Sequence, residues 1–567
     1  MQISREALGF CLVLFVITIL YMPILPTDFF SIDDSQLTQV ELIQNTPSLE
    51  GVVKIFTPGV GLDYYPLRDL TYWIDAHVFD NTPFNYRLQQ LFWFFVLCWA
   101  LWRIQLNFGV SQPLALGITF VWALHPYHTE MLSWISIRKD LLALTFGALG
   151  FLAYQKNKFW LCVALFGLSL GSKASLVLMP LLGFVALLLG GLEPNRKNFL
   201  QVSILSLLGV GSALFQKYFY SHHNDMSIDW GWDMRIKGVL IALGKYFVGF
   251  FDSSQIVLDV EFWGDWFTLN SKFLSIGVLL MIGFVVFLFR AQKNFKLMIW
   301  SAAIVLAYLP ISALIFPHRI FYASRYIEAV LFVFVLGLGI FVPKTTPRIL
   351  LGSVGIFFAL FFGYGTFKRV HLWAEPIELW EAAVKEYPQS IPLRSQFLTE
   401  LENQKNARLG MAAEWAELNK KSQHLMGELE KDCPLEGKAK FEENCVGVFH
   451  LRMNIEFRKK DSKQTRFFLE RSQVAILNSP WPLQNTYLSL NEKLKFYAHL
   501  FGWDKTEEIF NSEKLKKYPE VFEIFDCLYG QSKEGKRVSD KAKVWMNQLT
   551  KSGFYDPKWA KKISNCQ

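Results

Sequence analysis

The sequence predicts an all-α, polytopic membrane protein of about eleven spans, followed by a C-terminal α-helical domain in water. Of its 567 residues, 52% are hydrophobic and only 19% are charged, which is too apolar for a soluble protein of this length. Apolar runs recur up to about Phe367, and beyond that point the chain becomes charged and helix-periodic. We therefore expect a transmembrane domain over 1–368 and a soluble domain over 369–567.

The apolar runs and the polar gaps between them define the predicted topology. Basic residues such as Arg5, Lys156, Arg196 and Lys344 fall in alternate gaps, which the positive-inside rule assigns to the cytoplasm. The N-terminus is then cytoplasmic and the C-terminal domain periplasmic, in a bacterial inner membrane. The net charge of +8 comes largely from these loops and needs no nucleic acid partner. The predicted spans are 7–25, 88–107, 112–125, 140–155, 159–172, 175–191, 199–219, 272–290, 297–316, 326–342 and 349–367.

The first run could be a signal peptide or a retained anchor. It is followed by Tyr21-Met-Pro-Ile-Leu-Pro rather than by a small-x-small cleavage site. We therefore predict a retained anchor.

The soluble domain contains four of the seven cysteines, an even number that an oxidising compartment would allow to pair. A preference for short loops pairs Cys433 with Cys445 and Cys527 with Cys566, and the alternative is four free thiols. Helix pairs with Tyr-Pro breaks, as at Tyr387, indicate degenerate tetratricopeptide-like units. After about residue 425 an irregular helical domain is the alternative.

Three polar segments, 26–87, 125–140 and 220–271, fall on the same non-cytoplasmic side of the predicted topology. Their many Trp and Tyr residues are typical of helices lying in the headgroup layer. Most of the unusual polar residues of the chain therefore gather on one face, which indicates a site.

Asp33 and Asp34 lie in the first of these segments, just after the first span. Asp34 could cap a helix beginning at Gln36, together with Ser31 or Ser35, while Asp33 is solvated. The functional interpretation is a general base that deprotonates a hydroxyl acceptor, with the second acid orienting the acceptor or binding a cation.

The second segment contains His125, His128 and Glu130. Two histidines three residues apart and a glutamate could bind a metal, but no third strong ligand is fixed by spacing, and interfacial histidines are the alternative. We therefore predict no metal site.

Arg138, Lys139, Lys173 and Arg325 are basic residues on the outer side, where the positive-inside rule disfavours them. Lys173 could snorkel to the interface, and Arg325 could pair with Glu328. Bases that lack a protein partner are suited to a phosphate, so four of them beside an acidic pair indicate a site for an anionic lipid headgroup.

The motifs Ile32-Asp-Asp, Tyr64-Tyr-Pro-Leu-Arg-Asp, Ala123-Leu-His-Pro-Tyr-His-Thr-Glu and Gly171-Ser-Lys resemble those of the GT-C membrane glycosyltransferases. The branch that they resemble is the transmembrane and tetratricopeptide-repeat O-mannosyltransferase type. The resemblance covers roughly residues 1–425. This chain has Ala174 and Tyr65 where that family often has Glu and Arg.

The resemblance implies an inverting transfer of a sugar from a polyprenyl-phosphate carrier to a hydroxyl, such as a protein Ser or Thr or a glycan, at the periplasmic face. It implies Asp33 as the base with Asp34 beside it, and Arg138, Lys139 and Lys173 at the donor phosphate, to which the placement of the outer bases adds Arg325. Substrate contacts would come from His125, His128, Glu130, Tyr64 and Arg68. No cofactor is required, and a divalent cation is compatible with the mechanism. The alternatives are a non-enzymatic membrane scaffold and a lipid-linked glycan transporter.

Overall fold

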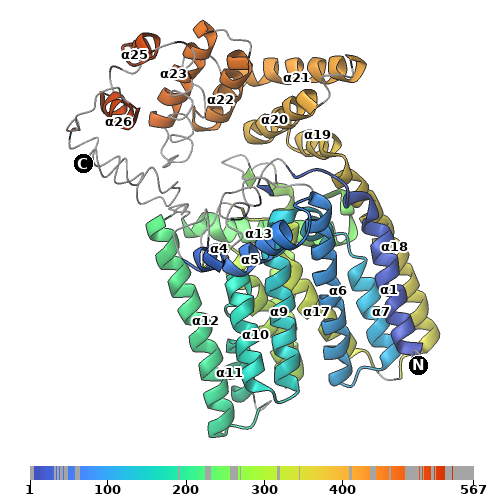
Figure 1. The fold of residues 1–567 in the computed structure, drawn as a ribbon. Helices are drawn as coiled ribbons and strands as arrows, with labels where there is room; N and C mark the ends of the chain where they lie inside the picture. Colours follow the sequence, from blue (N-terminus) through green and yellow to red (C-terminus); the bar gives the residue numbers. More distant parts are fainter. Residues whose placement is uncertain are drawn as a thin grey trace. The chain divides into compact units, whose positions relative to one another are not determined.

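A computed structural model shows the arrangement of the helices (Figure 1). It describes residues 5–30, 33–34, 38, 43, 49–57, 64–189, 192–223, 231–255, 266–267, 270–315, 320–343, 345–407, 412–433, 442–458, 462–478, 497, 501, 503–512, 516, 519–529 and 539. Within these ranges the regular structure is entirely helical, which confirms the predicted all-α class.

The chain divides into two compact units. The first contains 1–57, 64–218 and 227–383, and the second contains 384–567 with two short segments, 58–63 and 219–226. The sequence predicted a boundary at 368/369, which lies inside the continuous helix α18 (Arg348–Ala374).

The first unit is built from long helices joined by short ones, and α4 and α5 lie across one end of the long helices (Figure 1). Its helices are α1 (Arg5–Tyr21), α4 (Leu49–Ile55), α5 (Pro66–Val78), α6 (Pro83–Asn107), α7 (Gln112–Ala123), α8 (His128–Ser133), α9 (Arg138–Gln155), α10 (Phe159–Ser172), α11 (Leu181–Leu188), α12 (Arg196–His223), α13 (Trp232–Phe251), α15 (Leu274–Ala291), α16 (Phe295–Tyr308), α17 (Glu328–Phe341) and α18.

Each of the eleven predicted spans overlaps one of these helices. Among the residues that the structure describes, four stretches are long and apolar enough to cross a membrane: Ala7–Ile24, Arg196–Gln216, Ser271–Ala291 and Arg348–Ala374. A fifth span is counted if Phe159–Ser172 and Ala174–Leu188, which meet at a 120° bend, act as one. The chain therefore has the helices of a membrane protein, and the number of spans stays a prediction.

The bend has a local cause at Lys173. This residue ends α10 with an extended backbone, φ −166° and ψ 143°, and a short 3-10 turn over Ala174–Leu176 follows. The chain therefore turns sharply within one residue, and the Lys173 side chain projects from the turn instead of continuing along a helix face.

Helix α13 lies in the segment for which the sequence predicts only headgroup-layer helices, yet it has 20 residues. It packs closely against α15, since a Cβ added at Gly277 would lie 1.8 Å from the Leu240 carbonyl oxygen. A glycine is required at this contact because no side chain fits between the two backbones.

The second unit is a set of shorter amphipathic helices, in which α20 packs on α21 and α22 packs on α23. A disulfide joins Cys433, after α21, to Cys445 in α22, with a Cα–Cα distance of 5.5 Å. This pairing confirms one predicted disulfide. The other predicted pair includes Cys566, which lies outside the described residues, and the helices do not establish a tetratricopeptide repeat. Helix α19 (Pro376–Glu386) begins in the first unit, which runs to residue 383. The helices of the second unit are α20 (Ile391–Ala407), α21 (Ala412–Asp432), α22 (Glu442–Arg458), α23 (Ser462–Asn478), α25 (Trp503–Phe510) and α26 (Pro519–Tyr529).

Candidate functional site

The segment 125–138 holds the first unit together at the end where most of the predicted site residues lie. All six residues of α8 are buried. The carbonyl of Ser133 accepts a hydrogen bond from Arg87 Nε at 3.0 Å, and the carbonyl of Met131 accepts one from Gln90 at 2.8 Å. Side chains of α6 therefore satisfy backbone groups that a six-residue helix leaves unpaired.

Asp34 anchors the chain that follows α1 to this segment. Its carboxylate is fully buried and accepts the backbone N–H groups of Phe30 and Ser136, each at 2.9 Å. Burial raises the pKa of Asp34 to about 7, while the Phe30 N–H, the Arg87 charge and the Ser136 N–H oppose that rise. Asp34 is therefore a structural acceptor, with one local bond from Phe30 and one tertiary bond from Ser136, and neither is a cap of the predicted helix beginning at Gln36. Ser31, Ser35 and Gln36 lie outside the described residues.

Asp33 differs from its neighbour because it is only half-buried. Its described neighbours along the chain are both anchored, Asp34 by the hydrogen bonds above and Phe30 by ring contacts. The Phe30 ring stacks on Trp380 with centroids 5.6 Å apart, and it also contacts Trp134 and Trp373. Of the two acids, Asp33 is the one accessible to a substrate.

Arg138 lies at the first residue of α9 and is fully buried. It forms an ion pair with Asp75 of α5, donates to the Tyr86 carbonyl at 2.6 Å, and lies over the Tyr72 ring at 4.9 Å. The expectation that Arg138 lacks a protein partner is therefore wrong. Burial raises the pKa of Asp75, and the Arg138 charge opposes that rise.

His128 is buried between two acceptors. Its Nε2 lies 2.7 Å from the Trp122 carbonyl oxygen, and its Nδ1 lies 2.8 Å from Glu328 Oε2. A neutral imidazole has one N–H, so either the ring is protonated or Glu328 carries the second proton. Both nitrogens are engaged within the protein. His125 is also buried and lies among the rings of Tyr127, Phe250 and Phe362.

Arg325 pairs with Glu130 rather than with Glu328, so the alternative that the sequence suggested is wrong. The guanidinium also lies over the rings of Trp134, at 5.4 Å, and Tyr326, at 5.0 Å. Glu130, like His128, therefore fixes the start of α17 against α8. Helix α8 thus supplies the histidine of one of these contacts and the carboxylate of the other.

Lys173 is positioned by the bend after α10. Its Nζ lies 2.5 Å from Asp140 Oδ1 and 5.2 Å from the centre of the Tyr326 ring, and 18% of its side chain is exposed. Tyr326 therefore contacts both Lys173 and Arg325. The charges of Asp140 and Lys139 also act on its hydroxyl.

The Tyr65 ring likewise contacts two cationic side chains, those of Lys139 and Arg68. Lys139 Nζ lies 4.7 Å from the centre of its ring, and the Arg68 guanidinium lies 5.2 Å from it. Arg68 is buried and bonds Asp69 at 2.8 Å, whereas Lys139 is half-buried. Tyr64 points elsewhere, because its hydroxyl donates to the Phe56 carbonyl at 3.1 Å and its ring lies against Phe215.

We call the residues around Tyr65 and Tyr326 the cation cluster. Its members come from five separate stretches of the chain and leave one net positive charge, since four bases face three carboxylates. The bases are Arg68, Lys139, Lys173 and Arg325, and the carboxylates are Asp69, Glu130 and Asp140. The cluster is suited to an anion, since Lys139 and Lys173 retain exposed surface while the carboxylates are buried.

Sequence reasoning missed Asp75, Tyr326 and the pairing of Glu328 with His128. Asp75 is 63 residues from Arg138 and Glu328 is 200 residues from His128, so spacing carries no signal for these two pairs. The sequence marks Tyr65 only as a departure from a family motif and does not indicate its contacts with Lys139 and Arg68. Among the residues that the structure describes, no three His, Cys, Asp or Glu side chains are grouped to hold a metal ion.

Comparison with known proteins adds no family. No protein-family model, no curated protein and no solved structure matches the chain. The fold and the site therefore define a class, an all-α protein with several helices apolar enough to span a membrane and a cluster of charged side chains around two tyrosines.

Proposed function

We propose that this protein is an inverting membrane glycosyltransferase that moves a sugar from a polyprenyl-phosphate carrier to a hydroxyl acceptor, such as a protein Ser or Thr. The observation that carries the proposal is the cation cluster, in which Lys139, Lys173 and Arg325 gather around two tyrosines. A lipid phosphate is a good leaving group, so cations at the phosphate and one base for the incoming hydroxyl suffice.

Asp33 is the proposed base. The bond from the Ser136 N–H to Asp34, the residue after Asp33, holds this part of the chain beside the start of α9. Ser136 is three residues before Lys139. The acceptor oxygen would attack the anomeric carbon as the bond from that carbon to the phosphate oxygen breaks. The hydroxyl proton passes to Asp33, the bond electrons leave with the lipid phosphate, and the anomeric configuration inverts.

The geometry supports different roles for the predicted phosphate-binding residues. Lys139 and Lys173 keep part of their surface exposed, so they are the proposed direct contacts. Arg138 is buried and paired with Asp75, so its proposed role is to position the first turn of α9. In the same way, His128 would position Glu328, and Glu130 would position Arg325.

The proposed location is a bacterial inner membrane with the second unit in the periplasm. The Cys433–Cys445 disulfide supports this, because disulfides persist in oxidising compartments and are rare in the cytoplasm.

The test is transfer by purified protein in liposomes, with a radiolabelled sugar on a short polyprenyl phosphate and a mixed panel of Ser/Thr peptides. Asp33→Asn should abolish transfer while leaving the unfolding temperature unchanged. Asp80→Asn is the matched control, since Asp80 is exposed between α5 and α6. Equal transfer by Asp33→Asn and the wild type would exclude Asp33 as the base, and a scaffold would show no transfer with any variant.

A further inference from the structure

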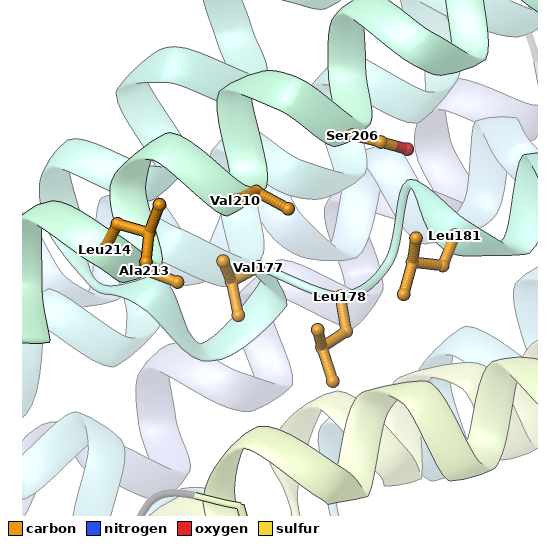
Figure 2. A pocket seen from close by; sticks show the side chains of 7 residues that line it. All are labelled: Val177, Leu178, Leu181, Ser206, Val210, Ala213 and Leu214. Carbon is orange, nitrogen blue, oxygen red and sulfur yellow. The ribbon is translucent and has the colours of Figure 1, made fainter.

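An apolar groove lies between the chain that follows the bend and helix α12. One wall is formed by Val177, Leu178 and Leu181, and the other by Ser206, Val210, Ala213 and Leu214 of α12 (Figure 2). Its volume is about 230 Å³. Apart from Ser206 the lining side chains are hydrocarbon, so the groove is suited to an apolar ligand.

The groove opens toward the outside of the first unit. Val210 is 51% exposed and Leu214 is 63% exposed, although both line the groove. On a helix that is long and apolar enough to span a membrane, such exposure faces lipid. A hydrocarbon chain could therefore enter from the bilayer without crossing water.

The groove also ends close to the level of Lys173. The two walls are antiparallel, since a Cβ at Gly209 would lie 2.5 Å from the Val177 carbonyl oxygen and one at Gly183 would lie 2.5 Å from Val202 Cγ2. The segment from Val177 back to Lys173 and the segment from Gly209 on to Ala213 each span four residues. Each rises by a similar distance along the groove, about 6–8 Å. Lys173 therefore lies about level with Ala213 and Leu214, at the end of the groove.

We propose that this groove binds the hydrocarbon chain of the lipid whose phosphate meets Lys173. A 150 Å³ apolar cavity holds benzene, so by proportion 230 Å³ holds about nine carbons, which is close to two isoprene units. The chain of a phosphate-bearing lipid would thus lie along α12 while its phosphate reaches the cation cluster. This inference rests on the proposed function only for the identity of the lipid as the donor.

The test measures binding without transfer, so that it stays separate from the proposed function. The probe is a polyprenyl phosphate without sugar that carries a diazirine in its second isoprene unit, added to the full-length protein in liposomes. Photolabelled peptides are then mapped by mass spectrometry. We expect labelling within 174–214, and at least ten-fold less of it in Val210→Trp and in Leu214→Trp, which fill the groove.

Leu207→Trp is the matched control, because Leu207 is 70% exposed on the same helix but does not line the groove. Photolabelling of Leu207→Trp should equal that of the wild type. Photolabelling of Lys173→Met should be at least five-fold lower than that of the wild type. Unchanged labelling in both groove variants would overturn the proposal. So would equal competition by excess phosphatidylglycerol and by unlabelled polyprenyl phosphate, since the groove would then bind any bilayer lipid. Labelling that persists in a protein with no transfer activity would refute the proposed function alone.

Discussion

Asp34 accepts the backbone N–H of Ser136 at 2.9 Å, which joins two residues that are 102 positions apart. Because the same carboxylate also accepts the N–H of Phe30, one buried side chain fixes the chain after α1 against the start of α9. Asp33 owes its position to this contact.

Asp34→Ala should lower the stability of the first unit much more than Asp33→Ala. The alanine leaves two N–H groups without their acceptor, and each buried unsatisfied group costs about 1–3 kcal/mol. Thermal unfolding in detergent should show a clear drop in Tm for Asp34→Ala and a change of less than about 1 kcal/mol for half-buried Asp33→Ala. Equal losses in the two variants would contradict the structural role of Asp34.

The stability of the fold should depend on pH through Asp34. Burial raises the pKa of this carboxyl from 3.8 to about 7, so between these values the folded state binds more protons than the unfolded state. The contribution of Asp34 to stability is therefore full below about pH 4 and is lost as the pH rises toward 7. Unfolding temperatures measured from pH 4.5 to 7.5 should fall less steeply in Asp34→Asn than in the wild type. Parallel curves would show that Asp34 does not titrate in this range.

Arg138 and Asp75 should behave as a coupled pair in stability measurements. Removing one partner of a buried ion pair costs about 3–5 kcal/mol, because the other charge is left uncompensated. Arg138→Met and Asp75→Leu should each destabilise the protein strongly, and the double variant should recover a large part of the loss. Additive effects in a double-mutant cycle of chemical denaturation would contradict the pairing.

The two ends of α9 offer a direct test of the proposed phosphate contact. Lys139→Gln should raise the KM for the lipid-linked donor about ten-fold, since a charge-assisted hydrogen bond contributes about 1.5–3 kcal/mol. Lys156→Gln, at the exposed other end of the helix, should leave the KM unchanged. The same KM in both variants would remove Lys139 from the phosphate site.

The disulfide of the second unit gives a prediction that needs no activity. Cys433 and Cys445 enclose 12 positions of sequence, and a loop of this length is expected to contribute about 3 kcal/mol. Peptide mapping of unreduced protein should recover Cys433 and Cys445 in one linked pair, and Cys433→Ser with Cys445→Ser should lower the Tm of the second unit. Recovery of both cysteines as free thiols from membranes of the native host would argue against a periplasmic location.

Helices and the short disulfide could be predicted from the sequence because their signals are local. Each predicted span overlaps a helix, and the paired cysteines are 12 positions apart. Helix α13 was missed as a long helix because Lys237 and Lys245 interrupt its apolar run, although Lys245 is buried and lies 4.5 Å from the centre of the Tyr322 ring.

The partners of the charged residues could not be predicted. Arg138 pairs with Asp75 and His128 with Glu328, and these choices depend on how α5 and α17 pack against α8 and α9. Charge and side of the membrane indicated which residues gather, but only three-dimensional packing distinguishes a base that holds the fold from one that stays accessible.

The bend at Lys173 has a consequence for the surrounding bilayer. Helix α10 has 14 residues and is therefore about 21 Å long at 1.5 Å per residue, whereas the hydrocarbon core is about 30 Å thick. In the predicted topology, where α10 crosses the membrane, a mismatch of this size is met by thinning of the bilayer around α10, by snorkelling of flanking residues such as Lys173, or by association of chains. The thickness of the host membrane, set by its acyl chain length, would then change how deeply Lys173 lies in the bilayer.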